Sequence, residues 1–217
     1  MDARVIFALS LAILFVYGAH SATFTFINNC PYTVWPGTLT APWSGRFWGR
    51  TQCAYTSGKF QCATADCGSG QITCNGAGAI PPASLVELTL AANGGKDFYD
   101  VSLVDGFNLP LSITPQGGSG GCSATSCPAN VNVTCPPELQ IKGSDGGVIA
   151  CKTSCFTFNQ PQYCGTGAYG SSDTCHPTKY SKIIKGQCPQ AYSYAFDDKS
   201  NTFTCSGGPN YLITFCP

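Results

Sequence analysis

The chain has 217 residues, among them 15 Cys, 25 Gly and 15 Pro, and its 11 basic and 11 acidic residues give a formal net charge of zero. Charged residues make up 10% of the chain and hydrophobic residues 43%, a composition that excludes a disordered protein. The balanced charge, with no Lys/Arg cluster, also argues against a nucleic-acid partner and against a polybasic membrane-binding surface.

The first 21 residues have the order of a secretory signal peptide. A short charged start is followed by an apolar run over 5–16 and then by small residues, of which Ala19 and Ser21 favour cleavage after Ser21, with Ala22 as the other site. The run is shorter than the roughly 20 residues that a membrane-spanning helix needs, so an N-terminal anchor is the less favoured alternative. The sequence predicts a secreted protein without a transmembrane segment.

All 15 Cys lie after the predicted signal peptide, where an oxidising compartment favours disulfides. The odd number leaves at least one thiol free or bonded to another molecule. A zinc site is disfavoured because no Cys-x-x-Cys pair occurs and His176 is the only His beyond the signal peptide. We expect no metal and no cofactor.

In chain order, the residues after the signal peptide first predict short strands separated by Gly and Pro turns. The two clearest strands, 85–90 and 98–104, are joined by a turn at 93–96 and are expected to form a hairpin. Such a pattern is typical of an antiparallel sandwich or barrel. The predicted strands are 23–27, 32–35, 46–48, 85–90, 98–104 and 211–215.

From about 117 to 188, Cys become denser and the strand patterns fade. Apolar spacing predicts two helices here, 148–156 and 179–185, the second with Thr178 as its N-cap and Gly186 at its end. We interpret this part of the chain as a loop-rich lobe held by disulfides.

Two carboxylates in the predicted hairpin form the first candidate site. By strand alternation, Glu87 and Asp100 lie on one face of neighbouring strands, and a pair of carboxyl groups is what glycoside hydrolysis requires. The alternative is that both are solvated residues on the wet face of a sheet. Asp105 closes the second strand in an Asp-Gly sequence, which is also a common turn.

Other chemistry is less well supported. His176 has no G-x-S-x-G motif to accompany it, so a Ser/His/Asp triad is disfavoured. The aromatic residues Trp35, Trp43, Phe47 and Trp48 could stack on sugar rings or fill the core. The sequon that begins at Asn132 marks a candidate N-glycosylation site.

Four segments carry a resemblance to a known family. They read ATFTFINNCPYTVW at 22–35, GKFQCATADC at 58–67, PQAYSY at 189–194 and ITFCP at 213–217. The chain resembles the thaumatin-like (osmotin-like, pathogenesis-related) proteins of plants, over essentially all of its length beyond the signal peptide.

The resemblance implies a mainly β protein with one thaumatin-like domain at 22–217. Its antiparallel β-sandwich core would occupy about 22–116 and 206–217, and a disulfide-rich lobe of loops and short helices about 117–205. An acidic cleft would lie between them. In that cleft Glu87 and Asp100 would be the catalytic residues, with Glu87 as general acid and Asp100 as nucleophile or base, and Arg46, Asp105 and Asp198 would bind the substrate.

The resemblance also implies a disulfide pattern. The family has sixteen Cys, and Gly165 occupies the position of the missing one, so its family partner Cys175 should be a free thiol. The implied pairs are Cys30 with Cys216, Cys53 with Cys62, Cys67 with Cys74, Cys122 with Cys205, Cys127 with Cys188, Cys135 with Cys151, and Cys155 with Cys164.

A second departure from the family is a deletion between Thr40 and Ala41, where the family has a segment long enough for two strands of the sandwich. Removing strands exposes core and creates new sheet edges. We hypothesise a truncated variant with an incomplete cleft wall and reduced stability.

The expected function is that of a secreted, monomeric plant defence protein, located in the apoplast or the vacuole. Its antifungal partner would be the β-1,3-glucan of fungal cell walls, and any enzymatic activity would be at most that of a weak endo-β-1,3-glucanase. Two alternatives stay open. One is a non-enzymatic interaction protein, either a membrane-perturbing factor or an inhibitor of pathogen enzymes, and the other is an impaired truncated variant.

Overall fold

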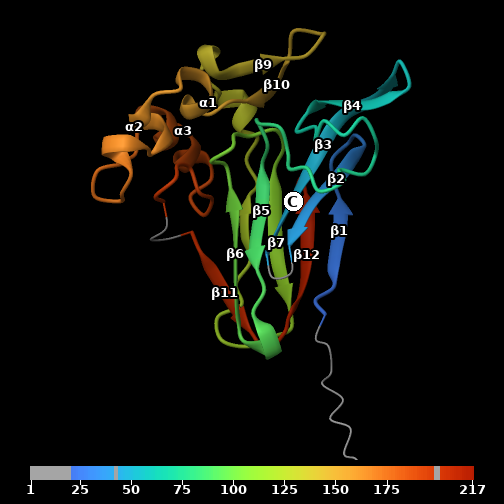
Figure 1. Cartoon of the computed structure of the whole chain (residues 1–217), viewed down its shortest axis with the longest axis vertical. Coiled ribbons are helices and arrows are strands. Elements are labelled where there is room, and N and C mark those ends of the chain that lie inside the picture. The colour runs from blue at the N-terminus through green and yellow to red at the C-terminus, as the bar shows by residue number, and fades with distance from the viewer. Residues whose placement is uncertain (1–20, 42–43, 198–200) are drawn as a thin grey trace, which may run out of the picture.

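The computed structural model describes residues 21–41, 44–197 and 201–217, so the predicted signal peptide lies outside the described residues apart from Ser21. Two sheets pack face to face (Figure 1). One has the strand order β1-β12-β7-β8, and the other has the order β11-β6-β5-β3-β2 with β4 paired to β3. These strands are β1 (Phe24–Asn28), β2 (Val34–Ala41), β3 (Ser44–Thr56), β4 (Lys59–Thr64), β5 (Leu85–Thr89), β6 (Lys96–Ser102), β7 (Leu111–Gln116), β8 (Thr125–Cys127), β11 (Phe203–Ser206) and β12 (Asn210–Phe215).

Strand alternation builds the core between the two sheets. Tyr211, Ile213 and Phe215 of β12 are buried against Tyr99 and Val101 of β6 and their neighbours in one apolar cluster. The named strands pair antiparallel, apart from β1, which runs parallel to β12. The structure confirms the predicted mainly β sandwich.

The lobe covers the upper end of the sandwich in Figure 1. Its elements are the hairpin strands β9 (Gln140–Lys142) and β10 (Val148–Cys151), the helices α1 (Ser154–Phe158), α2 (Pro161–Cys164) and α3 (Lys179–Gln187), and the 3-10 turns η2 (Val131–Thr134), η3 (Pro137–Leu139) and η4 (Gly167–Tyr169). A further turn, η1 (Ala92–Gly94), joins β5 to β6. Strand β8 and all of β11 except Ser206 fall within 117–205 in sequence, but both strands pair with the sandwich sheets.

One helix prediction is confirmed and the other is wrong. Helix α3 begins after Thr178, whose side chain accepts from the backbone N–H of Ser181, and it continues through Gly186 to Gln187. The range 148–156 contains the end of a hairpin and the start of α1 instead. Pairing with β9 holds 148–151 extended, and Thr153 caps the new helix at the N–H of Phe156.

Seven disulfides cross-link the described chain, in the pairs that the family resemblance implies. They join Cys30 with Cys216, Cys53 with Cys62, Cys67 with Cys74, Cys122 with Cys205, Cys127 with Cys188, Cys135 with Cys151, and Cys155 with Cys164. Gly165 adopts φ +64 at the end of α2, and a Cβ there would lie 2.8 Å from Cε2 of Phe196. This backbone suits glycine better than a cysteine.

Cys175 is a free cysteine and is 2% exposed. Burial raises the pKa of its thiol, and the thiol is less reactive than the thiolate. We therefore expect one thiol per molecule that reacts slowly with a maleimide in native buffer and fast in denaturant, as measured by intact mass. Rapid native labelling, or no labelling in denaturant, would contradict this.

Strands β2 and β3 pair along their whole shared length, from Val34 opposite Thr51 to Ala41 opposite Ser44. The hairpin therefore closes directly at the position of the proposed deletion, with residues 42–43 outside the described ranges.

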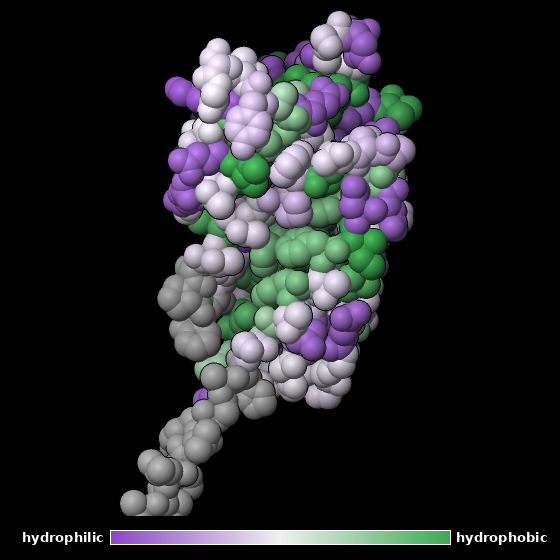
Figure 2. Space-filling model, turned by 90° about the vertical axis from the view of Figure 1, so that its right-hand side faces the viewer, coloured by the Kyte–Doolittle hydropathy of each residue, from purple (hydrophilic) through white to green (hydrophobic). Residues whose placement is uncertain are grey.

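Strands β1 and β2 end their sheets on the same side of the molecule (Figure 1). On that side apolar residues gather across the middle of the surface (Figure 2), and the β1 side chains Phe24 and Phe26 are only partly buried. The exposed edge supports the hypothesis of reduced stability, which stays a prediction.

Arg50 of β3 is 1% exposed, and its guanidinium contacts several segments on the β4 side of the molecule. Its Nη2 donates to the carbonyl oxygens of Ile72 at 2.7 Å and Pro36 at 3.2 Å, and its Nε donates to Trp35 at 3.3 Å. The guanidinium also lies 5.4 Å from the ring centre of Phe60. A buried cation thus links β2, β3, β4 and the loop that follows β4.

Two buried tyrosines make stability sensitive to alkali. Burial raises the pKa of Tyr99 to about 12, and burial together with a hydrogen bond to Asp97 raises the pKa of Tyr211 further. Since folding raises these pKa values, the stabilisation is complete below pH 10. It is lost as the pH rises from 10 towards 12 for Tyr99, and the loss continues at still higher pH for Tyr211. We expect the free energy of unfolding at pH 11 to be lower than at pH 9 by about 1 kcal/mol per tyrosine. Urea unfolding measures this, and a Tyr99→Phe variant should show a smaller loss.

Candidate functional site

Three of the predicted site residues lie side by side on neighbouring strands. Arg46 of β3 stands opposite Glu87 of β5, and Glu87 stands opposite Asp100 of β6. On the other side of Arg46, the same row reaches Leu39 of β2. The predicted hairpin of β5 and β6, and the placement of Glu87 next to Asp100, are confirmed by this register.

An ion pair organises the row. Nε of Arg46 lies 2.6 Å from Oε1 of Glu87, with side chains 50% and 29% exposed. A pair this exposed adds little to stability, typically less than about 1 kcal/mol. The ion pair acts instead on its neighbours in the row. The opposed carboxylates of Glu87 and Asp100 repel each other, and the positive charge of Arg46 reduces this repulsion.

These side chains line an open pocket of about 410 Å³, called here the acidic pocket. Its lining includes Leu39, Arg46, Glu87, Thr89, Phe98 and Asp100. Phe98 is 46% exposed and lies two residues before Asp100 on β6. It therefore offers an apolar ring beside the charged groups, on the same face of the sheet.

Sequence reasoning identified Phe98 as a strand residue only. The signal that could have placed it in the site is its spacing of two from Asp100, because alternate residues of a strand share a face. Thr89 has the same spacing of two from Glu87 on β5, whereas Leu39 carries a weaker signal, since its place in the pocket depends on the pairing of β2 with β3.

Of the two remaining expected substrate-binding residues, the structure describes only Asp105. Asp105 lies in the turn after β6, half-buried, where its carbonyl oxygen accepts from the N–H of Ala83 at 3.1 Å, and it is not among the residues that line the acidic pocket. Asp198 lies outside the described residues. The structure therefore brings together three of the five expected residues.

The sequon residue Asn132 is half-buried in η2. Its Nδ2, the atom to which an N-linked glycan attaches, donates to the carbonyl oxygen of Asn108 at 3.4 Å. The neighbouring Val133 is 81% exposed, so the turn itself reaches the surface. Glycosylation of Asn132 stays a prediction.

The described residues offer no group of three or more His, Cys, Asp or Glu side chains that could hold a metal ion. Within the same residues, no helix has both the length and the apolar character needed to cross a membrane. The chemistry available in the acidic pocket is that of two carboxyl groups, one guanidinium and an aromatic ring.

Comparison with known proteins places the chain among close relatives. A family model described as "Thaumatin family" matches residues 38–217. The chain is 65% identical to "Thaumatin-like protein 1" of Pyrus pyrifolia over 92% of this chain and 93% of that protein. It is 59% identical to a protein of Prunus avium called "Glucan endo-1,3-beta-glucosidase", over 98% of each chain.

A third relative bears on the deletion. "Thaumatin-like protein 1" of Castanea sativa is 59% identical over an alignment of 242 residues that covers all of both chains. Since this chain has only 217 residues, the alignment contains residues of the relative that this chain lacks. The longer alignment is what a deletion in this chain would produce. The position of the deletion near Thr40 rests on the family resemblance alone.

Proposed function

The chain belongs to the thaumatin family, and from this premise we propose that it is a secreted plant defence protein whose acidic pocket binds β-1,3-glucan of fungal cell walls. We further propose that it hydrolyses this glucan weakly, as an endo-β-1,3-glucanase. The seven disulfides fit a secreted protein, with the apoplast or vacuole as the proposed location and a monomer as the proposed state.

The observation that carries the proposal is the row of Arg46, Glu87 and Asp100 across three paired strands. Directly opposed residues have Cβ atoms about 4.5–5.5 Å apart. That spacing is compatible with the separation of about 5–5.5 Å between the carboxyl groups of retaining glycosidases. The name of the Prunus avium relative, 59% identical, points to the same bond type.

The pocket could hold a sugar by two kinds of contact. Phe98 presents an exposed ring on which the apolar face of a pyranose can stack. Arg46 and the two carboxylates can hydrogen-bond to hydroxyl groups, and charged partners make the stronger hydrogen bonds. Together these contacts favour a polyhydroxylated ligand over an apolar one.

The ion pair constrains the catalytic roles. Nε of Arg46 occupies Oε1 of Glu87 at 2.6 Å, whereas a general acid must present its carboxyl oxygen to the glycosidic oxygen that it protonates. The acid role proposed for Glu87 therefore requires that bound glucan draw Arg46 away, for example through hydrogen bonds to sugar hydroxyls. Asp100 would then act as nucleophile or base.

Retention on an insoluble β-1,3-glucan tests the binding. We expect wild-type protein to sediment with the glucan, and Phe98→Ala to lower its affinity roughly fivefold because the stacking ring is lost. Phe98 is half exposed, so the variant should fold. Phe156→Ala is the matched control, since Phe156 is 53% exposed on α1, away from the acidic pocket.

No retention of the wild type would contradict glucan binding and favour a non-enzymatic interaction with another partner. Retention that Phe98→Ala and Arg46→Met both leave unchanged would place the glucan at a different surface. In either case the acidic pocket would lose its proposed role.

A further inference from the structure

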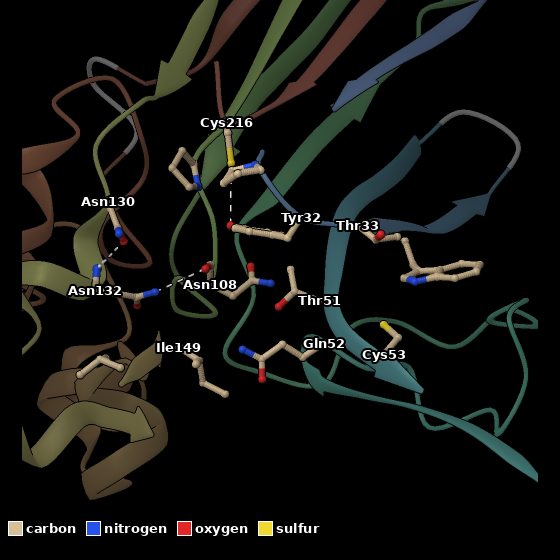
Figure 3. Close-up of a pocket in the computed structure, with 14 residues that line it drawn as sticks. Tyr32, Thr33, Thr51, Gln52, Cys53, Asn108, Asn130, Asn132, Ile149 and Cys216 are labelled. Carbon is tan, nitrogen blue, oxygen red and sulfur yellow. Dashed lines mark hydrogen bonds between the residues drawn. The ribbon is translucent and has the colours of Figure 1, made fainter. Parts of the chain in front are cut away.

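A second cavity, of about 600 Å³, lies between the sandwich and the lobe. One wall comes from β3 and the segment before β2, and the other comes from η2 and β10 (Figure 3). Its lining includes Tyr32, Thr33, Trp35, Gln52, Asn130 and Asn132. The volume falls within the range of about 300–1,000 Å³ typical of small-molecule sites. We call it the neutral pocket.

The described residues that line the neutral pocket include no charged side chain. Phosphates, carboxylates and metal ions therefore lack the ionic partners on which their recognition depends. The lining is not purely apolar either, because it includes amides from both walls and hydroxyls from the wall of β3 and the segment before β2. This combination favours an uncharged ligand that is rich in hydrogen-bonding groups.

Two amide side chains, one on each wall, have hydrogen-bonding groups without a partner inside the described part of the chain. Oδ1 of Asn132 makes no hydrogen bond within the described part of the chain and has almost no accessible surface, so the amide must turn to present it to a ligand, while its Nδ2 is bonded to Asn108. Gln52 is exposed at the cavity. Amides both donate and accept, as do the hydroxyls of a sugar, so the two groups are complementary.

The floor of the pocket is rigid. Nδ2 of Asn108 donates to the carbonyl oxygen of Gly49 at 2.8 Å and to Oγ1 of Thr64 at 2.9 Å, and its Oδ1 accepts from the N–H of Ser84 at 3.0 Å. A disulfide fixes Cys216 at the rim. Fixed groups lose little freedom when a ligand binds, which favours affinity.

Gln52 has an unusual backbone for its position. It adopts φ +51 within β3, although its neighbours Thr51 and Cys53 both pair with β4. A non-glycine residue in the left-handed region costs roughly 1 kcal/mol or more, and such residues cluster at ligand sites. The strain is consistent with a role for this side chain at the cavity.

Two aromatic rings complete the lining. Trp35 is half-buried and held by an edge-on contact with Phe60, with ring centres 5.0 Å apart. Tyr32 is 45% exposed, and its phenol hydroxyl is protonated and can donate at neutral pH, since the ordinary pKa of a tyrosine is about 10. Aromatic rings offer flat apolar surface to the faces of pyranoses.

We propose that the neutral pocket is a second binding site, which takes an uncharged saccharide of one or two pyranose rings. The site does not depend on the proposed function of the acidic pocket, because the two pockets share no lining residue. Strand β3 contributes Arg46 to the acidic pocket and Gln52 to the neutral pocket. These two residues are about 20 Å apart along an extended strand.

The proposal has a consequence for the sequon. A sugar attached to Nδ2 of Asn132, which lines the pocket, would leave a single N–H on that atom and would stand in the pocket. The neutral pocket can accept a free saccharide only if Asn132 carries no glycan. The intact mass of the secreted protein, before and after enzymatic removal of N-glycans, measures this directly.

The binding test is a titration of the full secreted protein with the disaccharide of two β-1,3-linked glucose units, followed by nuclear magnetic resonance of the side-chain amides. We expect shifts at Gln52 and Asn132, and a weaker response to glucuronate, which carries a charge. Gln52→Gly removes the amide and relieves the positive φ, so this variant should fold and raise Kd roughly fivefold. Gln61→Ala removes an exposed amide of β4 outside the lining and should leave Kd unchanged.

Several results would overturn the proposal. They are a glycan on Asn132, the absence of any shift, shifts confined to the surroundings of Glu87 and Asp100, or an unchanged Kd in Gln52→Gly. Shifts at both pockets would support both sites. Shifts at the neutral pocket alone would support this inference while counting against the proposed function of the acidic pocket.

Discussion

Replacing Glu87 by Gln is expected to lower the rate of β-1,3-glucan hydrolysis by at least about a hundredfold, since a positioned acid or base contributes a factor of this size. The substitution keeps the shape of the side chain but removes the carboxyl group that pairs with Arg46. Glu87 is 29% exposed on the open face of the sheet, so the core is unaffected. Release of reducing sugar from a linear glucan measures the rate.

The matched control is Glu138→Gln, the same change at the other Glu beyond the signal peptide. Glu138 accepts a hydrogen bond from Tyr180 in the lobe and does not line the acidic pocket, so its variant should keep the wild-type rate. Equal, near-background rates for wild type and Glu87→Gln would leave a protein that binds without catalysis.

An aryl glycoside separates the two roles, because its leaving group needs no proton. If Glu87 is the acid, Glu87→Gln should lose much less of its rate on this substrate than on glucan. Asp100→Asn should lose its rate on both substrates if Asp100 is the nucleophile. The opposite pattern would exchange the two assignments.

Replacing Arg50 by Met is expected to destabilise the protein by about 3–4 kcal/mol. The variant keeps an unbranched side chain but leaves the carbonyl oxygens of Trp35, Pro36 and Ile72 without their donor. Each buried acceptor that loses its partner costs roughly 1–3 kcal/mol. Burial lowers the pKa of Arg50 itself, partly offset by Asp66, and this cost of burying the cation is recovered in the variant.

Thermal unfolding followed by circular dichroism should show a fall in Tm of about 10 °C for Arg50→Met. Arg46→Met is the matched control on the same strand. Because its ion pair is half exposed, the loss should stay below about 1 kcal/mol. A similar Tm for both variants would mean that the buried guanidinium does not hold β2, β4 and the following loop together.

Most of the sandwich can be predicted from the sequence, because buried strands that alternate carry a local signal. The hairpin of β5 and β6 is the clearest case, because alternation and the predicted turn place Glu87 and Asp100 on one face of neighbouring strands, and the register makes them direct neighbours. The disulfide pairs come from the family resemblance and could not be obtained from spacing.

Several elements that sequence reasoning missed depend on distant partners, although β4, also missed, pairs with its neighbour β3. Strand β7 contains Pro115, which disfavours a strand locally, yet β7 pairs with β12 at the far end of the chain. The segment 148–151 has helical spacing, but it is held extended by β9. The neutral pocket is beyond local prediction because its walls come from segments about 80 residues apart, such as Gln52 and Asn132.

The disulfide between Cys30 and Cys216 joins residues 186 positions apart, so nearly the whole described chain forms one covalent ring. A protease that cuts a single exposed loop inside this ring opens it without producing two separate pieces. The smaller disulfide loops, such as those at Cys53–Cys62 and Cys67–Cys74, repeat this protection locally. A nicked molecule therefore keeps its parts together and can remain folded, which gives the protein durability where proteases are abundant.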